Sequence, residues 1–305
     1  MEANPEANAS TGQPQPYGEI FDRGYQHYSG ERLGRSFAIR RLIIYSIKRG
    51  LGIKKRWTSK ILPIILYGLA YIPAFIIVAL FAFLPASDLE GFGFDSLYGV
   101  IEIVILIYAS ALAPEMLCDD RRERTLQLYF SRPLTRLDYL ASKVTAMGLL
   151  MSTIIFGPPL LLFLGLTFSD DSPISYFANH LTDLLKITSY GLLVSAFFGA
   201  LSLSIATFTT RKGVAAAIFI IGALMLQGIA RSFYEAIGEG SLRGYLVFIS
   251  PPDFIDSLRR WLFRTDSQND LFAATDLPGV VTLIWLVVVI GVAMFLMHRT
   301  YLQED

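Results

Sequence analysis

The sequence predicts an all-α integral membrane protein with six transmembrane helices. Of its 305 residues, 53% are hydrophobic and only 17% are charged, and the mean hydropathy is +0.48. A soluble domain has roughly 25% charged residues, and a core of this size could not bury so much apolar surface. In addition, six stretches approach or exceed the length of about 20 apolar residues that crosses the hydrocarbon core.

The N-terminal segment, residues 1–30, is polar and acidic and contains three prolines. It has neither the basic start nor the apolar run of a secretion signal. Such a composition buries little apolar surface and favours disorder. We therefore expect a disordered cytoplasmic tail over residues 1–30 and one folded domain over residues 31–305.

The segment Ser36–Arg49 is expected to form a basic amphipathic helix before the first span. On a helix, its apolar residues share one arc and its basic residues occupy the rest. The apolar set is Ile39, Leu42, Ile43 and Ile47, and the basic set is Arg40, Arg41, Lys48 and Arg49. A helix of this type lies in the membrane interface. It acts either as an anchor beside anionic lipid or as an elbow that transmits movement of a cytoplasmic partner to the first span.

The six predicted spans follow in order along the chain. They are Ile61–Leu84, Ser96–Pro114, Val144–Ser169, Ile187–Thr210, Gly213–Ala230 and Leu277–Met297. The apolar stretch Gly244–Pro252 is too short to cross alone, so it is either a re-entrant piece or an extension of the fifth span. Prolines inside the first and third spans are expected to kink these helices.

The orientation of the chain follows from its basic residues. Lys and Arg are concentrated before the first span, between spans two and three, and between spans four and five. The intervening short loops contain acids and no base. Because basic loops stay on the cytoplasmic side, the sequence predicts a multi-pass protein of the plasma membrane with both termini in the cytoplasm.

The loop between spans two and three is the most informative stretch. Residues Asp119–Phe130 are predicted to form a short charged helix just below the membrane. Proline disfavours helix in the residue before it, so Pro133 ends this element. Thr135 then caps a new helix, with Asp138 three residues later to complete the cap, and this helix continues into the third span.

This loop resembles the first cytoplasmic loop of ABC transporter permeases of the ABC-2 type. The family pattern is an acid–Arg pair, Gly-Thr-Leu/Glu, Pro followed by Ser/Thr-Arg, and a Lys at the start of the next span. The matching positions are Asp120-Arg121, Thr125-Leu126, Pro133, Thr135-Arg136 and Lys143. Arg124 stands where the family usually has glycine.

The resemblance implies a function and a set of partners. Residues 31–305 would be a transmembrane permease domain, working with a separate ATP-binding-cassette ATPase that binds ATP and Mg, and with a second permease chain. The loop would be the coupling helix that docks on the ATPase, and export is implied. The implied coupling residues are Asp119, Asp120, Arg121, Arg122, Arg124, Thr125, Leu126, Tyr129, Pro133 and Arg136.

Several motifs of enzymes and binding sites are absent from the sequence. No GxxxxGK[ST], GxSxG or HExxH occurs, so the sequence predicts no ATP site of the P-loop kind and no catalytic residues. The single Cys118 and three scattered histidines predict no metal site. The zero net charge gives no sign of nucleic-acid binding. Membrane lipid is the remaining expected partner.

Polar residues within the spans are candidates for a translocation path. Glu102 and Gln227 are the deepest polar groups of the spans, and an ionisable residue in a span is a functional candidate. Ser195 and Ser202 belong to a small-residue stripe of the fourth span, which favours close helix packing over pore lining. The segment Ser250–Phe263 predicts an external helix that lies on the outer membrane face or forms a gate or dimer contact.

Two other function classes compete with the permease interpretation. A secondary transporter or channel would show repeats or charged sites at mid-membrane, and the sequence has little of either. A membrane-embedded lipid-diphosphate enzyme would use acids such as Asp119 and Asp120 to bind Mg²⁺. That enzyme needs a second acidic cluster on the same side, whereas Asp253 and Asp256 are predicted to lie outside.

Overall fold

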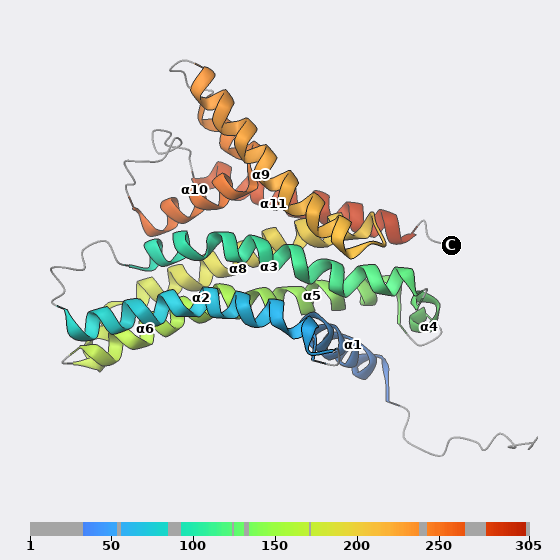
Figure 1. The fold of residues 1–305 in the computed structure, drawn as a ribbon, viewed down its shortest axis with the longest axis horizontal. Coiled ribbons are helices and arrows are strands. Elements are labelled where there is room, and N and C mark those ends of the chain that lie inside the picture. The colour runs from blue at the N-terminus through green and yellow to red at the C-terminus, as the bar shows by residue number, and fades with distance from the viewer. Residues whose placement is uncertain are drawn as a thin grey trace, which may run out of the picture. The chain divides into compact units, whose positions relative to one another are not determined.

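The fold is all-helical within the residues that the computed structural model describes: 33–53, 56–84, 93–123, 125–130, 134–170, 172–237, 243–265 and 279–302. The helices are α1 (Arg35–Gly50), α2 (Thr58–Phe83), α3 (Phe94–Arg122), α4 (Leu126–Phe130), α5 (Arg136–Ile155), α6 (Gly157–Ser169), α7 (Pro173–Asn179), α8 (Leu181–Thr207), α9 (Lys212–Ala236), the 3₁₀ helix η2 (Arg243–Ile249), α10 (Pro251–Phe263) and α11 (Gly279–Leu302) (Figure 1). The predicted disordered tail, residues 1–30, lies outside the described residues.

Among the described residues, six helical spans are long and apolar enough to cross a membrane, as the sequence predicts. By length and composition they are α2, α3, α5 together with α6, α8, α9 and α11. In the third span, α5 ends at Ile155 and α6 begins at Gly157, because Pro158 and Pro159 lack the N–H groups that would continue α5. The Tyr71 hydroxyl of α2 donates a hydrogen bond to the Thr153 carbonyl at 2.8 Å, near this break.

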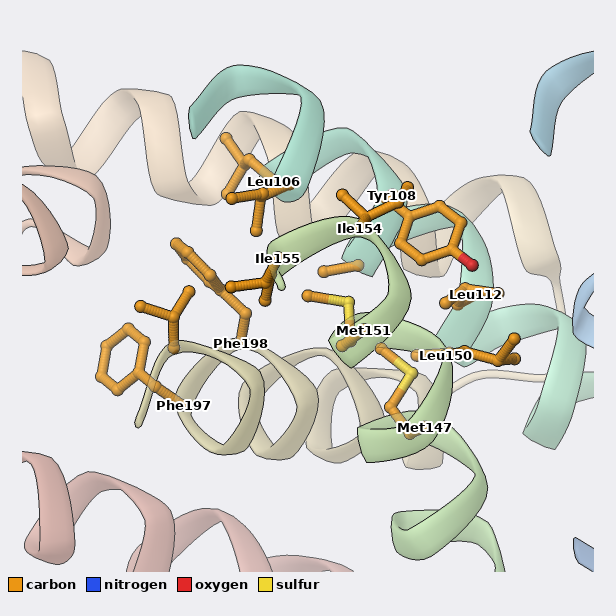
Figure 2. Close-up of a cluster of buried hydrophobic side chains, with 14 of the residues drawn as sticks. Leu106, Tyr108, Leu112, Met147, Leu150, Met151, Ile154, Ile155, Phe197 and Phe198 are labelled. Atoms are coloured by element: carbon orange, nitrogen blue, oxygen red, sulfur yellow. The ribbon is translucent and has the colours of Figure 1, made fainter. Parts of the chain in front are cut away.

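The core lies where α3, α5 and α8 meet. Figure 2 shows side chains of these three helices in one buried cluster. The labelled residues are Leu106, Tyr108 and Leu112 of α3, Met147, Leu150, Met151, Ile154 and Ile155 of α5, and Phe197 and Phe198 of α8. In contrast, α2, α9 and α11 leave most of their apolar residues exposed. Their exposed faces therefore suit lipid or another membrane chain.

The entry helix α1 packs on the rest of the fold through its predicted apolar arc. Leu42 is buried, and Ile39, Ile43 and Ile47 pack against the core, mainly through contacts of α1 with α5. A second stripe of α1, Phe37, Ile44 and Tyr45, remains exposed. The helix is thus apolar on two faces, and its inner face is attached to the start of the third span.

The predicted helix Asp119–Phe130 is wrong in its extent. Helix α3 continues unbroken from the second span to Arg122, and α4 is a separate five-residue helix. The acids at the end of α3 remain helical because they find cationic partners inside the protein, as described below. The capping box of Thr135 and Asp138 at the start of α5 is confirmed.

The segment Gly244–Pro252 folds back on the fifth span instead of extending it. Val247 of η2 is buried against Ala230 and Tyr234 of α9. The Ser250 side chain then caps α10 by accepting a hydrogen bond from the Asp253 N–H. Of the two alternatives for this segment, the extension of α9 is therefore excluded.

Helix α10 forms as predicted from Ser250–Phe263, and it packs between other helices. Phe254, Ile255 and Leu258 are buried, and α10 contacts α3, α8 and α9. The Arg259 guanidinium donates a hydrogen bond to the Asp95 carbonyl at 2.8 Å, next to Gly99, where a Cβ atom would lie 2.5 Å from it. In Figure 1, α1 and α4 lie at one end of the helices and α10 lies toward the other; these are called the α4 end and the α10 end.

Candidate functional site

A buried ionic network joins four helices at the α4 end. Its members are Arg49 of α1, Glu115, Asp119 and Asp120 of α3, Tyr139 and Lys143 of α5, and Lys212 of α9. Each member lies in the first or last turns of its helix, on the same side of the protein. The network therefore connects segments that are far apart in the sequence, at the point where they leave the apolar part of the fold.

Asp120 is the centre of the network. Its side chain is 1% exposed, and it pairs with the Lys143 ammonium at 2.7 Å, whose side chain is also 1% exposed. The Tyr139 hydroxyl donates to Asp120 at 2.8 Å, and Arg49 pairs with its other oxygen. Tyr139 and Lys143 are four residues apart, so a single face of α5 presents both. Lys143 also donates to the Met116 carbonyl at 2.9 Å.

Asp119 extends the network to α1 and α9. The Arg49 guanidinium reaches Asp119 at 2.8 Å as well as Asp120, so one planar donor group holds two carboxylates. Lys212 pairs with Asp119 and, at 2.8 Å, with Glu115 one turn earlier. Burial by itself lowers the pKa of Arg49, but its bond to Asp119 and the charge of Asp120 outweigh burial and raise that pKa. Arg49 therefore stays protonated.

The other end of α1 is also tied to α5. The Arg35 guanidinium donates to both carboxylate oxygens of Asp138, at 2.9 and 2.7 Å. The hydrogen bond to Asp138 raises the pKa of Arg35. This pair is exposed on the Arg35 side, so it contributes little free energy by itself. Its consequence is geometric, because α1 is held at both ends.

A cavity of about 190 Å³ lies in the other half of the fold. It is lined by Gly99, Glu102, Ile103 and Leu106 of α3, Phe198 of α8, Leu224 and Gln227 of α9, and Pro252 of α10. The structure thus brings together two predicted translocation-path residues, Glu102 and Gln227. The other two, Ser195 and Ser202, do not line this cavity and are buried on α8. Beside them, Gly191 lies against the Phe156 ring, as expected of close packing.

Comparison with known families decides what kind of protein this is. A family model described as ABC-2 family transporter protein matches residues 10–305. The chain belongs to the ABC-2 transporter family. A comparison with curated proteins gave no match. Members of this family are membrane components of ABC transport, generally without an ATPase site of their own and paired with an ATPase subunit.

In this ABC-2 transporter chain, the structure gives the loop motif a physical role. Its acid, Asp120, and its distal lysine, Lys143, form one buried ion pair between the second and third spans. The Thr125 hydroxyl and N–H both donate to the Asp120 carbonyl, at 3.2 and 3.1 Å, which closes the turn after α3. Three elements of the sequence motif therefore fix the geometry on either side of the loop.

The other predicted coupling residues are divided between interior and surface. Leu126 and Tyr129 of α4 pack partly on the core, and Tyr129 lies 5.6 Å from the Tyr139 ring between centroids. Arg121 and Arg136 are half-buried, whereas the Arg122 side chain is 60% exposed. Arg124 and Pro133 lie outside the described residues.

Four members of the network were missed by sequence reasoning: Arg49, Glu115, Tyr139 and Lys212. Arg49 was assigned to the basic face of the entry helix, and the sequence analysis gave the other three no role in a site. The sequence does contain one indication of such a network, because charged residues at the ends of apolar spans need partners. The identity of that partner depends on how the helices pack, which the local pattern does not specify.

Proposed function

We propose that the chain is the membrane-spanning subunit of a transporter driven by a separate ATP-binding-cassette ATPase, and that it exports its substrate. In this proposal the ATPase binds ATP and Mg, and a second permease chain completes the transporter. The α4 end faces the cytoplasm, together with both termini, and the membrane is the plasma membrane. Family membership and the charge bias of the loops support these assignments.

The observation that carries the proposal is the buried ionic network. A subunit that is driven by another chain must pass force from their contact to its own spans. The Asp120–Lys143 pair joins the last turns of α3 to the first turns of α5, so the loop between them moves with both spans. Arg49 and Lys212 connect the same point to α1 and α9. Breaking a buried pair leaves an uncompensated charge, so such a joint resists separation.

The proposed docking surface is the outward side of the loop. Arg122, Glu123 and Gln127 are exposed there, and Leu126 and Tyr129 stand behind them, half-buried. Charged rim residues and a few packed anchors are the usual composition of a protein interface. Because Asp119 and Asp120 are buried and already paired, in this proposal they act on the docking segment indirectly, by holding its ends.

The positions of the acidic residues do not favour the alternative function, a membrane-embedded lipid-diphosphate enzyme. Asp119 and Asp120 are bound by cations of the network, and Asp253 lies at the α10 end, where Gln227 and Arg231 donate to it. The two acidic groups therefore do not converge on one diphosphate. A secondary transporter would also use a cavity with a carboxylate, but it would need no joint at the α4 end.

Co-purification tests the proposal. The tagged chain, extracted from its own membranes, should retain a P-loop ATPase whose ATP hydrolysis is inhibited by vanadate. Gln127→Trp places a bulky ring on the docking surface and should reduce the retained ATPase at least fivefold. Asn179→Trp makes the same kind of change at the exposed end of α7 and should have no effect. Equal retention by both variants, or a chain that transports without any ATPase, would overturn the proposal.

A further inference from the structure

A cavity of about 210 Å³ lies at the α4 end, beside the ionic network. Helices α1, α2, α3 and α9 contribute to its lining, and α2 and α9 each pack on α3. Ser59, Leu62 and Gly213 line the cavity and are exposed, so it opens to the surface of the protein at α2 and α9. A ligand in this cavity would therefore be accessible from the membrane side of these two spans.

The lining of this cavity changes from polar to apolar along its length. Ser59 near the start of α2 and Glu115 near the end of α3 lie at the α4 end, where the polar lining residues gather. Leu66 and Tyr108 are seven residues deeper on the same two helices, which is about 10 Å at 1.5 Å per residue. The Tyr108 hydroxyl is hydrogen-bonded with the Tyr67 hydroxyl at 3.2 Å, so its polar group is already bonded. This order, polar at the membrane boundary and apolar below it, matches that of a lipid molecule.

The polar end of the cavity offers hydrogen-bond donors. The Lys212 ammonium has three N–H groups, and its ion pairs with Glu115 and Asp119 use two of them. The Lys212 side chain is 28% exposed, so its third N–H group can reach a ligand. The Ser59 hydroxyl is a second donor at the opening. An ammonium group and a hydroxyl suit the oxygens of a phosphate, which accept charge-assisted hydrogen bonds.

The rim of the cavity carries an excess of positive charge. Within the ionic network, the three cations balance the three carboxylates. Lys48, Lys60 and Arg211 are each next to a lining residue in the sequence, and none of them is buried. Residues 35–60 contain no acid at all. Basic residues at a membrane boundary attract anionic headgroups, so the charge of the rim favours an anionic lipid.

We propose that this cavity binds one anionic phospholipid, with the phosphate at Lys212 and Ser59 and the start of an acyl chain against Leu66 and Tyr108. The cavity equals roughly seven liquid waters in volume, so it holds only this part of the lipid. The rest of the molecule lies outside, along the exposed apolar face of α2 that begins at Leu62. Placement of the lipid in the cytoplasmic leaflet rests on the proposed orientation of the chain, whereas the binding site does not.

Lipid retention by the purified chain tests the site. The chain in detergent is incubated with equal amounts of phosphatidylglycerol and phosphatidylcholine, freed of excess lipid by size exclusion and analysed by native mass spectrometry. Phosphatidylglycerol should be retained at least threefold more than phosphatidylcholine, and excess inorganic phosphate should not displace it. Equal retention of the two lipids would overturn the proposal. Displacement by inorganic phosphate would also overturn it, because the site would then belong to a free anion.

Two pairs of variants locate the site. Ala216→Phe fills the cavity and should lower the retained phosphatidylglycerol at least fivefold, whereas Ala217→Phe, at an exposed neighbour outside the lining, should not. Ser59→Ala removes a donor to the phosphate and should lower retention of both lipids at least twofold. Its control is Ser36→Ala on the exposed side of α1. Each variant must elute as the parent does and unfold at a similar temperature. Retention by well-folded Ala216→Phe or Ser59→Ala that equals retention by its control would overturn the proposal.

The preference for an anionic headgroup is tested at the rim. Replacement of both Lys48 and Arg211 by Gln should abolish the threefold preference for phosphatidylglycerol. Replacement of both Arg40 and Arg41 by Gln makes the same change of charge on the exposed side of α1, away from the lining, and should leave the preference intact. Equal effects of the two double variants would overturn the proposal, because the preference would then belong to the basic surface as a whole.

The same measurements distinguish a lipid from a second copy of the chain. Loss of a dimer in Ala216→Phe, with lipid retention unchanged, would assign the cavity to a second copy and overturn the proposal. The retention assay contains no ATPase, so its failure would leave the proposed function standing. Conversely, absence of an ATPase in co-purification would refute the proposed function and leave the lipid site standing.

Discussion

The Asp120 carboxylate forms ion pairs with Lys143 and Arg49 and accepts a hydrogen bond from the Tyr139 hydroxyl, and its side chain is almost completely buried. A buried ion pair of this kind is weak evidence for stability, because desolvation offsets much of the attraction. Its partners are nevertheless strongly interdependent, since removal of one leaves the other charged and buried. The network is therefore better understood as a device that fixes how α1, α3, α5 and α9 meet than as a source of stability.

This interdependence predicts the effect of Lys143→Met. Asp120 would keep Arg49 but lose its closest buried ammonium, so we expect a loss of about 3 kcal/mol in the free energy of unfolding, the lower end for breaking a buried pair. Thermal unfolding in detergent, calibrated by a double-mutant cycle with Asp120→Asn, measures it. Lys186→Met breaks a more exposed pair with Asp183 and should cost under about 1 kcal/mol. Equal losses in the two variants would contradict this account of the network.

At the residue scale, only part of the site was predictable. The loop motif identified Asp120, Thr125 and Lys143 together, because their spacing along the chain is characteristic. Nothing local connects residue 49 with residue 119 or residue 212. Their contacts arise from the packing of α1 and α9 on α3, which depends on the whole set of helices.

The ends of helices were predictable from the sequence where an apolar stretch ends, and less predictable where the helix continues into charged residues. Six spans are recovered, but α3 continues past the predicted end at Pro114 to Arg122. The sequence suggested a break because a run of charged residues begins at Asp119. These residues remain helical because Asp119 and Asp120 point into the ionic network, and charged residues can end a span when partners inside the protein compensate them. Apolar contacts hold η2 and α10 against the bundle, since Val247 packs on Ala230 and Tyr234 and Phe254 is buried in the core.

Packing of the fourth span predicts the effect of Gly191→Val. A Cβ at Gly191 would lie 2.7 Å from the Phe156 ring, so either this ring or α8 must shift. Overpacking of this kind costs about 1–3 kcal/mol. Gly222→Val on α9 is the control, because a Cβ there would have no neighbouring atom within 4 Å and the helix-propensity change is the same. A similar unfolding temperature for the two variants would show that the small residues of α8 do not mediate close packing.

For the whole molecule, the two ends of the fold separate the charged loops as the sequence predicts. The network brings the ends of α1 and α3 together with the starts of α5 and α9, all of them beside basic loops. The pair of Arg259 and Asp95 lies at the α10 end. This alternation was predictable from charge counts alone. The charges of the loops do not predict the cavity between α3, α8, α9 and α10, because that cavity depends on where α10 packs.

Labelling of introduced cysteines would determine which end faces the cytoplasm. The single native Cys118 is fully buried, so the parent chain should react little with a membrane-impermeant maleimide. Ala178→Cys places a thiol on exposed α7 at the end opposite α4, and Gln127→Cys places one on exposed α4. Because the basic loops accompany α4, we expect Ala178→Cys to be labelled on intact cells and Gln127→Cys only after permeabilisation. The reverse labelling pattern would show that the α4 end faces outward. The proposed docking surface would then lie outside the cell, where no ATP-binding subunit could reach it.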